Sequence, residues 1–123
     1  LIKQGVLSIM VEHIAVINNK KYQTNGLPST CSKSIVTDLL KNELKFNGLI
    51  VTDAMNMGGV AKVPNASSKA IEAGCDILLM PLNARKAHSE ISKLYSSNSE
   101  FQQKVNTAAK RIIRMKICLA LLD

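Results

Sequence analysis

Asp53 is the residue whose type and position most clearly point to chemistry. It follows residues 48–52, Gly-Leu-Ile-Val-Thr, a continuous apolar and β-branched stretch. Such a stretch is typical of a strand buried on both faces, because helices covering a parallel sheet leave it no polar face. Enzymes of the α/β class place functional groups at the carboxyl ends of such strands. Asp53 is therefore a candidate carboxylate nucleophile, although an aspartate after a strand more often caps the following loop.

Three further residues lie near the expected strand ends. His13 follows an apolar segment and is expected near a strand end, where a lone histidine is more often a packed, hydrogen-bonded residue than a catalyst. Met55 and Met57 come directly after Asp53, where methionines usually serve packing. His88 has no chemical partner within its predicted helix and is expected at the surface.

The elements that position these residues alternate between strand and helix. Strands are predicted from residue 8 to about residue 13, over residues 48–52, and over residues 76–80. Helices are predicted over residues 35–44, with Ser32 as a cap, and over residues 67–73, ending at Gly74, the usual residue of a left-handed helix end. Two more are predicted over residues 84–95 and from 99 to about 121, while residues 57–65 read as a loop.

This order indicates an α/β fold with parallel strands and right-handed crossovers. Patterning alone does not separate a small doubly wound sheet from part of a (β/α)8 barrel. A full barrel needs about 250 residues, and this chain has 123. If the fold is a TIM barrel, the chain is a portion of one.

Composition excludes several classes of function. The net charge of +7 raises the possibility of nucleic-acid binding, but the basic residues are scattered and only 3% of residues are aromatic. The basic cluster at residues 110–116 is expected to be a solvated helix face. No apolar run is long enough to span a membrane. The three cysteines (Cys31, Cys75 and Cys118) are far apart and suit neither a disulfide framework nor a metal site, so they are expected to be buried or half-buried.

The segment around Asp53 closely resembles the active-site signature of glycoside hydrolase family 3. The resemblance rests on residues 39–56: two leucines, a lysine, Glu43, then Gly48, an aliphatic run ending in Thr52, and Asp53. It continues over nearly the whole chain, through residues 9–14, 27–32, 70–81 and 108–116. By this resemblance, residues 1–123 form the C-terminal part of the catalytic barrel, with strands six to eight and their helices.

The resemblance implies a retaining, exo-acting β-glycosidase without a metal or organic cofactor. Asp53 would be the nucleophile, and His13, Met55 and Met57 would lie near the sugar. The sequence of residues 52–57 is similar to that of the N-acetylglucosaminidase branch, which makes a terminal β-linked N-acetylglucosamine the expected substrate. A β-glucosidase or β-xylosidase of the same family is the alternative.

The resemblance also implies that essential parts lie elsewhere. In the family the proton donor is a histidine on an upstream loop or a glutamate in a second domain, and neither stretch occurs in this chain. The chain alone is therefore expected to be inactive and to need the missing N-terminal half of the barrel. An inactive truncated fragment and an independent α/β binding module remain alternatives, although Gly58-Gly59 lacks the spacing of a phosphate-binding loop. The sequence does not identify the cellular compartment.

Overall fold

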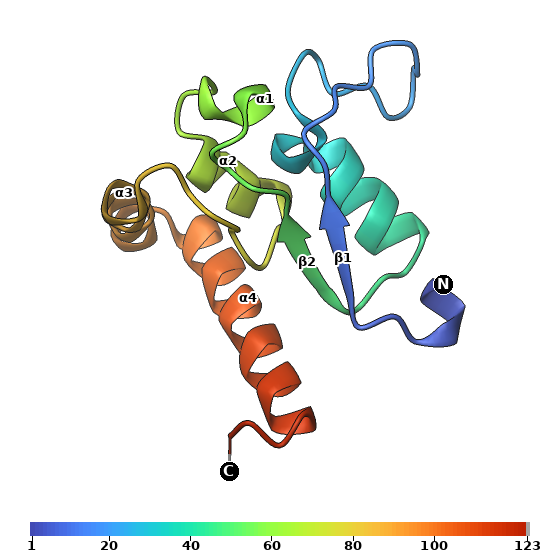
Figure 1. Ribbon diagram of the computed structural model, residues 1–123, viewed down its shortest axis with the longest axis vertical. Helices are drawn as coiled ribbons and strands as arrows, with labels where there is room; N and C mark the ends of the chain where they lie inside the picture. Colours follow the sequence, from blue (N-terminus) through green and yellow to red (C-terminus); the bar gives the residue numbers. More distant parts are fainter. Residues whose placement is uncertain (123) are drawn as a thin grey trace.

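A computed structural model describes residues 1–122. The elements follow in the order η1 (Ile2–Gln4), β1 (Ser8–Val11), η2 (Ser29–Cys31), η3 (Ser34–Glu43), β2 (Leu49–Thr52), α1 (Gly58–Ala61), α2 (Ala66–Ala73), α3 (Ala84–Ser97) and α4 (Ser99–Cys118). The two strands lie side by side and point the same way, with η3 on one side of them and α4 on the other (Figure 1). The fold is of the α/β class, as predicted.

The sheet is parallel and in register. Ser8 pairs with Leu49 and Val11 with Thr52, so the chain leaves both strands at the same edge. The first strand ends at Val11, two residues earlier than predicted. In β2 the side chains of Leu49, Ile50 and Thr52 are buried, which confirms the strand predicted from its continuous apolar run.

The third predicted strand, residues 76–80, does not form as a regular strand. The segment runs parallel to β2 and makes one isolated bridge, between Val51 and Ile77. The N–H group of Leu79 then donates to the side-chain Oγ1 of Thr52 (2.9 Å) instead of to a backbone carbonyl. Met80 next adopts a φ of +46°. A side-chain acceptor and a left-handed residue interrupt the ladder, and the sequence pattern signals neither.

The helices confirm most of the prediction and correct four details. Gly74 ends α2 with a φ of +114°. Ser32 does not cap η3: Lys33 precedes that helix, and the Ser32 hydroxyl is within 2.8 Å of the Ser34 hydroxyl. The helix η3 is a π-helix, with a wider turn than the apolar spacing predicted. The segment predicted as a loop contains α1, and α4 ends at Cys118, short of the predicted end.

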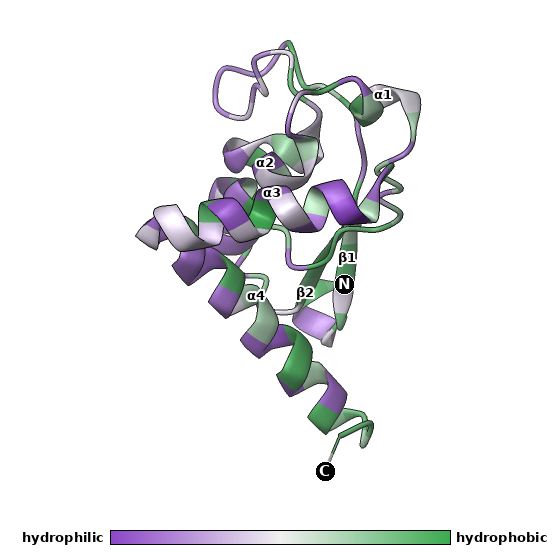
Figure 2. Cartoon of the chain, turned by 90° about the vertical axis from the view of Figure 1, so that its left-hand side faces the viewer, coloured by the Kyte–Doolittle hydropathy of each residue, from purple (hydrophilic) through white to green (hydrophobic). Residues whose placement is uncertain are grey.

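The core lies between the sheet, η3 and α2. Its buried members come from every part of the chain up to Cys75: Val11, Cys31, Val36, Leu40, Phe46, Ile50, Met55, Val60, Ala70, Ala73 and Cys75. Helix α4 contributes less, since Phe101 and Ala108 are its buried residues and Leu119, directly after it, is 52% exposed. Figure 2 shows green and purple segments alternating along α4 and green loops and turns at its C-terminal end.

Asp76 links β2, η3 and α4 near the amino ends of the strands. Its side chain is 3% exposed, and its Oδ2 accepts a hydrogen bond from the Ile50 N–H group at 2.9 Å. Arg111 Nη1 lies 3.6 Å from the same oxygen, and Lys41 Nζ lies 4.0 Å from Oδ1. Asp76 is thus a structural residue, whereas Arg111 departs from the solvated face predicted for the basic cluster.

Within residues 1–122, none of the helices combines the length and the hydrophobicity needed to cross a membrane.

Candidate functional site

Asp53 stands directly beyond the carboxyl end of β2. Its N–H group donates to the carbonyl oxygen of Val11 at 3.0 Å, which extends the parallel ladder by one step. Its Oδ1 accepts a hydrogen bond from the Ala54 N–H group at 2.7 Å. No ion pair within residues 1–122 involves Asp53. The ladder therefore fixes the backbone of this residue, and a single amide fixes one oxygen of its carboxylate.

His13 reaches across from the end of β1 to the chain that follows Asp53. Its Nε2 lies 3.0 Å from the Ala54 carbonyl oxygen, and its Nδ1 lies 2.8 Å from Thr30 Oγ1. Gly59 packs tightly on the same residue, because a Cβ there would lie 3.2 Å from the Cβ of His13. Both ring nitrogens thus have protein partners, which is the packed alternative considered for this histidine.

Thr52 and Met55 connect β2 to the third parallel segment. Thr52 is fully buried; its N–H donates to the Ile77 carbonyl oxygen at 3.0 Å, and its hydroxyl accepts from Leu79. The Met55 N–H group donates to the Leu79 carbonyl oxygen at 2.8 Å. These bonds hold the chain on both sides of Asp53, so the segment carrying the carboxylate is rigid on two flanks.

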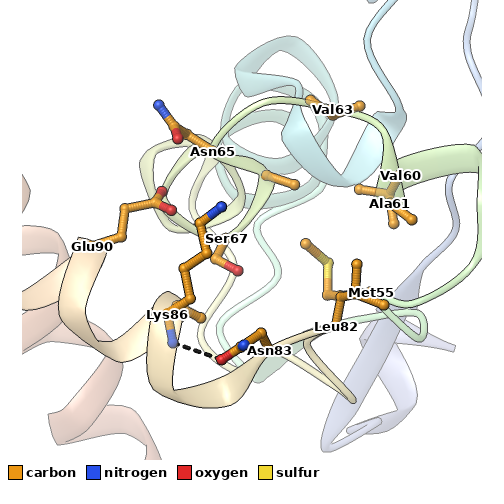
Figure 3. A pocket seen from close by; sticks show the side chains of 12 residues that line it. Met55, Val60, Ala61, Val63, Asn65, Ser67, Leu82, Asn83, Lys86 and Glu90 are labelled. Carbon is orange, nitrogen blue, oxygen red and sulfur yellow. Dashed lines mark hydrogen bonds between the residues drawn. The ribbon is translucent and has the colours of Figure 1, made fainter.

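The two candidate methionines occupy different environments. Met55 is 3% exposed and belongs to the core, whereas Met57 is 46% exposed. Met55 also lines a cavity of about 130 Å³ between α1, α2 and the start of α3. Figure 3 shows Met55 beside Leu82 on one side of this cavity and Glu90 on the other. A role in substrate binding stays a prediction for both methionines.

The cysteines fall into two groups. Cys31 and Cys75 are buried, and burial raises the pKa of their thiols to about 11 and about 12. A thiol with so high a pKa is a poor nucleophile, because the thiolate is the reactive form. Cys118 is exposed, contrary to expectation. Among residues 1–122 no group of three or more histidine, cysteine or acidic side chains is placed to hold a metal ion. His88 is exposed, as predicted.

Sequence reasoning missed Thr30 and Ala54 as parts of the site. Thr30 is fully buried, and its hydroxyl lies within hydrogen-bonding distance of His13 and of the carbonyl oxygens of Val11 and Glu12. Ala54 contributes only its backbone. A threonine hydroxyl 17 residues from His13 and a backbone carbonyl 41 residues away leave no periodic signal that a sequence pattern could have revealed.

The fold and the site together define an α/β protein with a carboxylate presented at the end of a buried parallel strand. The model of the family described as "Glycosyl hydrolase family 3 N terminal domain" matches residues 1–115. The chain belongs to this family.

Curated relatives carry related names. The chain is 30% identical over 129 residues to the "Beta-N-acetylglucosaminidase/beta-glucosidase" of Cellulomonas fimi, a match that covers 98% of this chain and 23% of that protein. It is 28% identical over 127 residues to the "Beta-hexosaminidase A" of Pseudoalteromonas piscicida, covering 90% of this chain and 21% of the relative. The chain thus spans less than a quarter of the length of these relatives.

Solved structures agree with this assignment. The Beta-N-acetylhexosaminidase from Beutenbergia cavernae superposes with a TM-score of 0.80 at 26% identity, covering 94% of this chain and 35% of that one. The structure named "Beta-glucoside phosphorylase BglX" gives a TM-score of 0.82 at 26% identity, covering 98% and 23%.

Proposed function

We propose that this chain is the nucleophile-bearing part of a retaining, exo-acting β-N-acetylglucosaminidase. Asp53 attacks the anomeric carbon of a terminal β-linked sugar, and water resolves the glycosyl-enzyme that forms. The observation that carries the proposal is the position of Asp53, directly after a buried parallel strand in a chain of this family. A nucleophile of this kind must be ionised and held in one orientation. Strand β1 holds the backbone of Asp53, and residues 77–79 hold Thr52 and Met55 on either side of it.

The proposal includes a larger barrel. Strand β1 pairs on one side with β2, and its other edge has no partner among residues 1–122. On that side an apolar hollow lies between β1 and η3, lined by Ile9, Val11, Ile14, Ile35, Leu39 and Leu44. An open edge and an uncovered apolar hollow suit a piece of a closed barrel, because closure removes sheet edges. We place residues 1–123 as strands six to eight of a (β/α)8 domain whose missing half completes the site.

The proton donor lies outside this chain in the proposal. A retaining glycosidase needs a second group that first gives and later takes a proton. His13 contacts Ala54, the residue that follows Asp53, but both of its ring nitrogens are already bonded to Thr30 and Ala54. The chain by itself is therefore inactive, and an upstream histidine loop or a second domain supplies this group.

The test compares two proteins on chromogenic substrates. The 123-residue chain and a version extended upstream are given 4-nitrophenyl β-N-acetylglucosaminide and the corresponding β-glucoside. Turnover of the N-acetylglucosaminide by the extended form alone supports the proposal. Turnover by the short chain would contradict the proposal that the proton donor lies outside it. Turnover by neither protein would contradict the assignment as an active glycosidase.

Asp53→Asn in the extended form tests the nucleophile directly. Loss of the carboxylate removes covalent catalysis, so turnover should fall by several orders of magnitude while the fold is retained. The matched control is Asp38→Asn, at an exposed ion pair on η3. Turnover of Asp53→Asn within about tenfold of the parent, about 1.4 kcal/mol of barrier, would refute the role.

A second candidate substrate follows from the relatives. The Cellulomonas fimi relative is named for both N-acetylglucosaminidase and glucosidase activity, and a Formosa agariphila relative, 26% identical over 106 residues, is named a putative beta-xylosidase. The same assay on the β-glucoside and β-xyloside decides between them. Because one structural neighbour is named a phosphorylase, each reaction is run with and without inorganic phosphate, and a glycosyl phosphate product would replace hydrolysis by phosphorolysis.

A further inference from the structure

We infer that His13 is a positioning residue: with Thr30 it forms a hydrogen-bonded relay that holds Ala54 and, through it, the carboxylate of Asp53. This inference rests on the proposed function and deepens it, since it replaces the expected contact between His13 and the sugar by a role within the protein. The relay joins η2 to the segments that follow β1 and β2.

The Ala54 end of the relay fixes which nitrogen of His13 carries a proton. A backbone carbonyl oxygen accepts and cannot donate, so the Nε2 that lies 3.0 Å from the Ala54 oxygen must be the N–H nitrogen. In the neutral ring the other nitrogen, Nδ1, is then an acceptor. Thr30 Oγ1 lies 2.8 Å from Nδ1. Because an acceptor Nδ1 needs a donor, Thr30 gives its single hydroxyl proton to this nitrogen and not to the carbonyl oxygens of Val11 and Glu12, which are 3.1 Å and 3.0 Å away.

Thr30 is held in place by its burial and by the bonds of the residue before it. Its side chain is fully buried, and its Oγ1 lies close to the carbonyl oxygens of Val11 and Glu12. The preceding residue, Ser29, bonds the carbonyl oxygen of Ile14 through both its N–H group and its hydroxyl, at 2.8 Å and 2.7 Å. The residue after His13 is therefore bonded to η2, and both ring nitrogens have partners, so the ring has little freedom to turn.

Ala54 is the residue through which the relay reaches the carboxylate. Its carbonyl oxygen accepts from His13, while its N–H group donates to Asp53 Oδ1 at 2.7 Å. Restraining this alanine at its carbonyl therefore restrains the donor that orients the aspartate. Oδ1 is occupied by this amide, so the relay leaves Oδ2 as the oxygen that attacks the sugar. Gly59 lies close to the Cβ and the backbone oxygen of His13, so the start of α1 packs against this residue.

The first test detects the relay by spectroscopy and needs no enzyme activity. The chain contains two histidines, and the exposed His88 serves as an internal reference for nitrogen-15 spectra of the imidazoles in the 123-residue chain. We expect a single Nε2–H tautomer for neutral His13 and a tautomer mixture for His88. Thr30→Val, which keeps the shape but removes the hydroxyl, should shift the Nδ1 resonance, and Thr30→Ser should leave it close to that of the parent. Tautomer averaging at His13 would overturn the relay.

The second test measures kcat and KM of the extended enzyme, to detect the positioning role. Thr30→Val should lower kcat about ten- to a hundredfold, because a displacement of about 1 Å at a reacting group costs up to about a hundredfold. KM should change by less than about twofold, since the sugar contacts are untouched. Thr30→Ser should recover most of the lost kcat, and Thr107→Val, at an exposed threonine of α4, is the matched control.

The outcomes separate the relay from the proposed function. A raised KM with unchanged kcat in Thr30→Val and His13→Gln would return His13 to a direct sugar contact. An unchanged kcat together with the expected tautomer would remove the positioning role. Absence of turnover in the extended parent would refute the proposed function and the catalytic part of this inference with it, while the nitrogen spectra would still decide whether the relay exists.

Discussion

The buried carboxylate of Asp76 gives the sharpest prediction about stability. It accepts a hydrogen bond from the Ile50 N–H group at 2.9 Å and faces Arg111 and Lys41 at 3.6 Å and 4.0 Å. Burial lowers the pKa of the Lys41 ammonium, and the charge of Asp76 opposes that fall. Asp76→Ala would leave a strand N–H group without its acceptor and two partly buried cations without their counter-ion.

The expected cost follows from how buried the partners are. Removing one member of a buried ion pair costs about 3–5 kcal/mol. The side chains of Lys41 and Arg111 are 19% and 25% exposed and can turn partly toward water, so the lower end of that range, about 3 kcal/mol, applies. Asp76→Asn keeps an oxygen for the Ile50 N–H group and loses only the charge, so its cost should be about 1–2 kcal/mol.

Urea unfolding followed by circular dichroism measures both variants against the parent. The control is Asp38→Asn, because the Asp38–Lys33 pair is exposed and surface pairs of this kind contribute little; its urea midpoint should match the parent's. An Asp76→Ala midpoint as close to the parent's as that of the control would refute the reasoning. So would an Asp76→Asn variant as unstable as Asp76→Ala, because the charge would then account for the whole effect.

Three further predictions concern packing and thiols. Gly48→Ala should destabilise the chain by about 1–3 kcal/mol, because the added Cβ would lie 2.4 Å from a backbone carbonyl oxygen. Gly58→Ala, which has open space around it, should leave stability unchanged, and thermal unfolding compares the two variants. A thiol reagent should modify Cys118 rapidly and reach Cys31 and Cys75 only in denaturant; three fast equivalents would contradict their burial. The raised pKa of Cys75, about 12 against 9.0, means that the folded state keeps a proton that the unfolded state loses, so its contribution to stability is intact below pH 9 and falls between pH 9 and 12. Cys75→Ala should therefore flatten the alkaline loss of stability, and an unchanged slope in urea titrations across that range would contradict the shift.

The local sequence was enough to predict the elements closest to Asp53. The apolar, largely β-branched run of residues 49–52 is typical of an inner parallel strand, so the strand and the acid at its end could be predicted from the pattern. Gly74 likewise ends α2 because glycine adopts a left-handed φ without a side-chain penalty. The irregular third segment was not predictable in this way, because Thr52 interrupts its ladder from another strand.

The sequence by itself determined the α/β pattern, the place of Asp53 and, through residues 39–56, the resemblance to the family. Only the tertiary structure decided what surrounds them. His13 and Ala54 meet because parallel strands bring their carboxyl ends to one edge, and η2 brings Thr30 to the same place. Asp76 meets Lys41 of η3 and Arg111 of α4 because these helices lie on either side of the strands. Such contacts join residues 17 to 41 positions apart, and their geometry arises from packing, which no local spacing encodes.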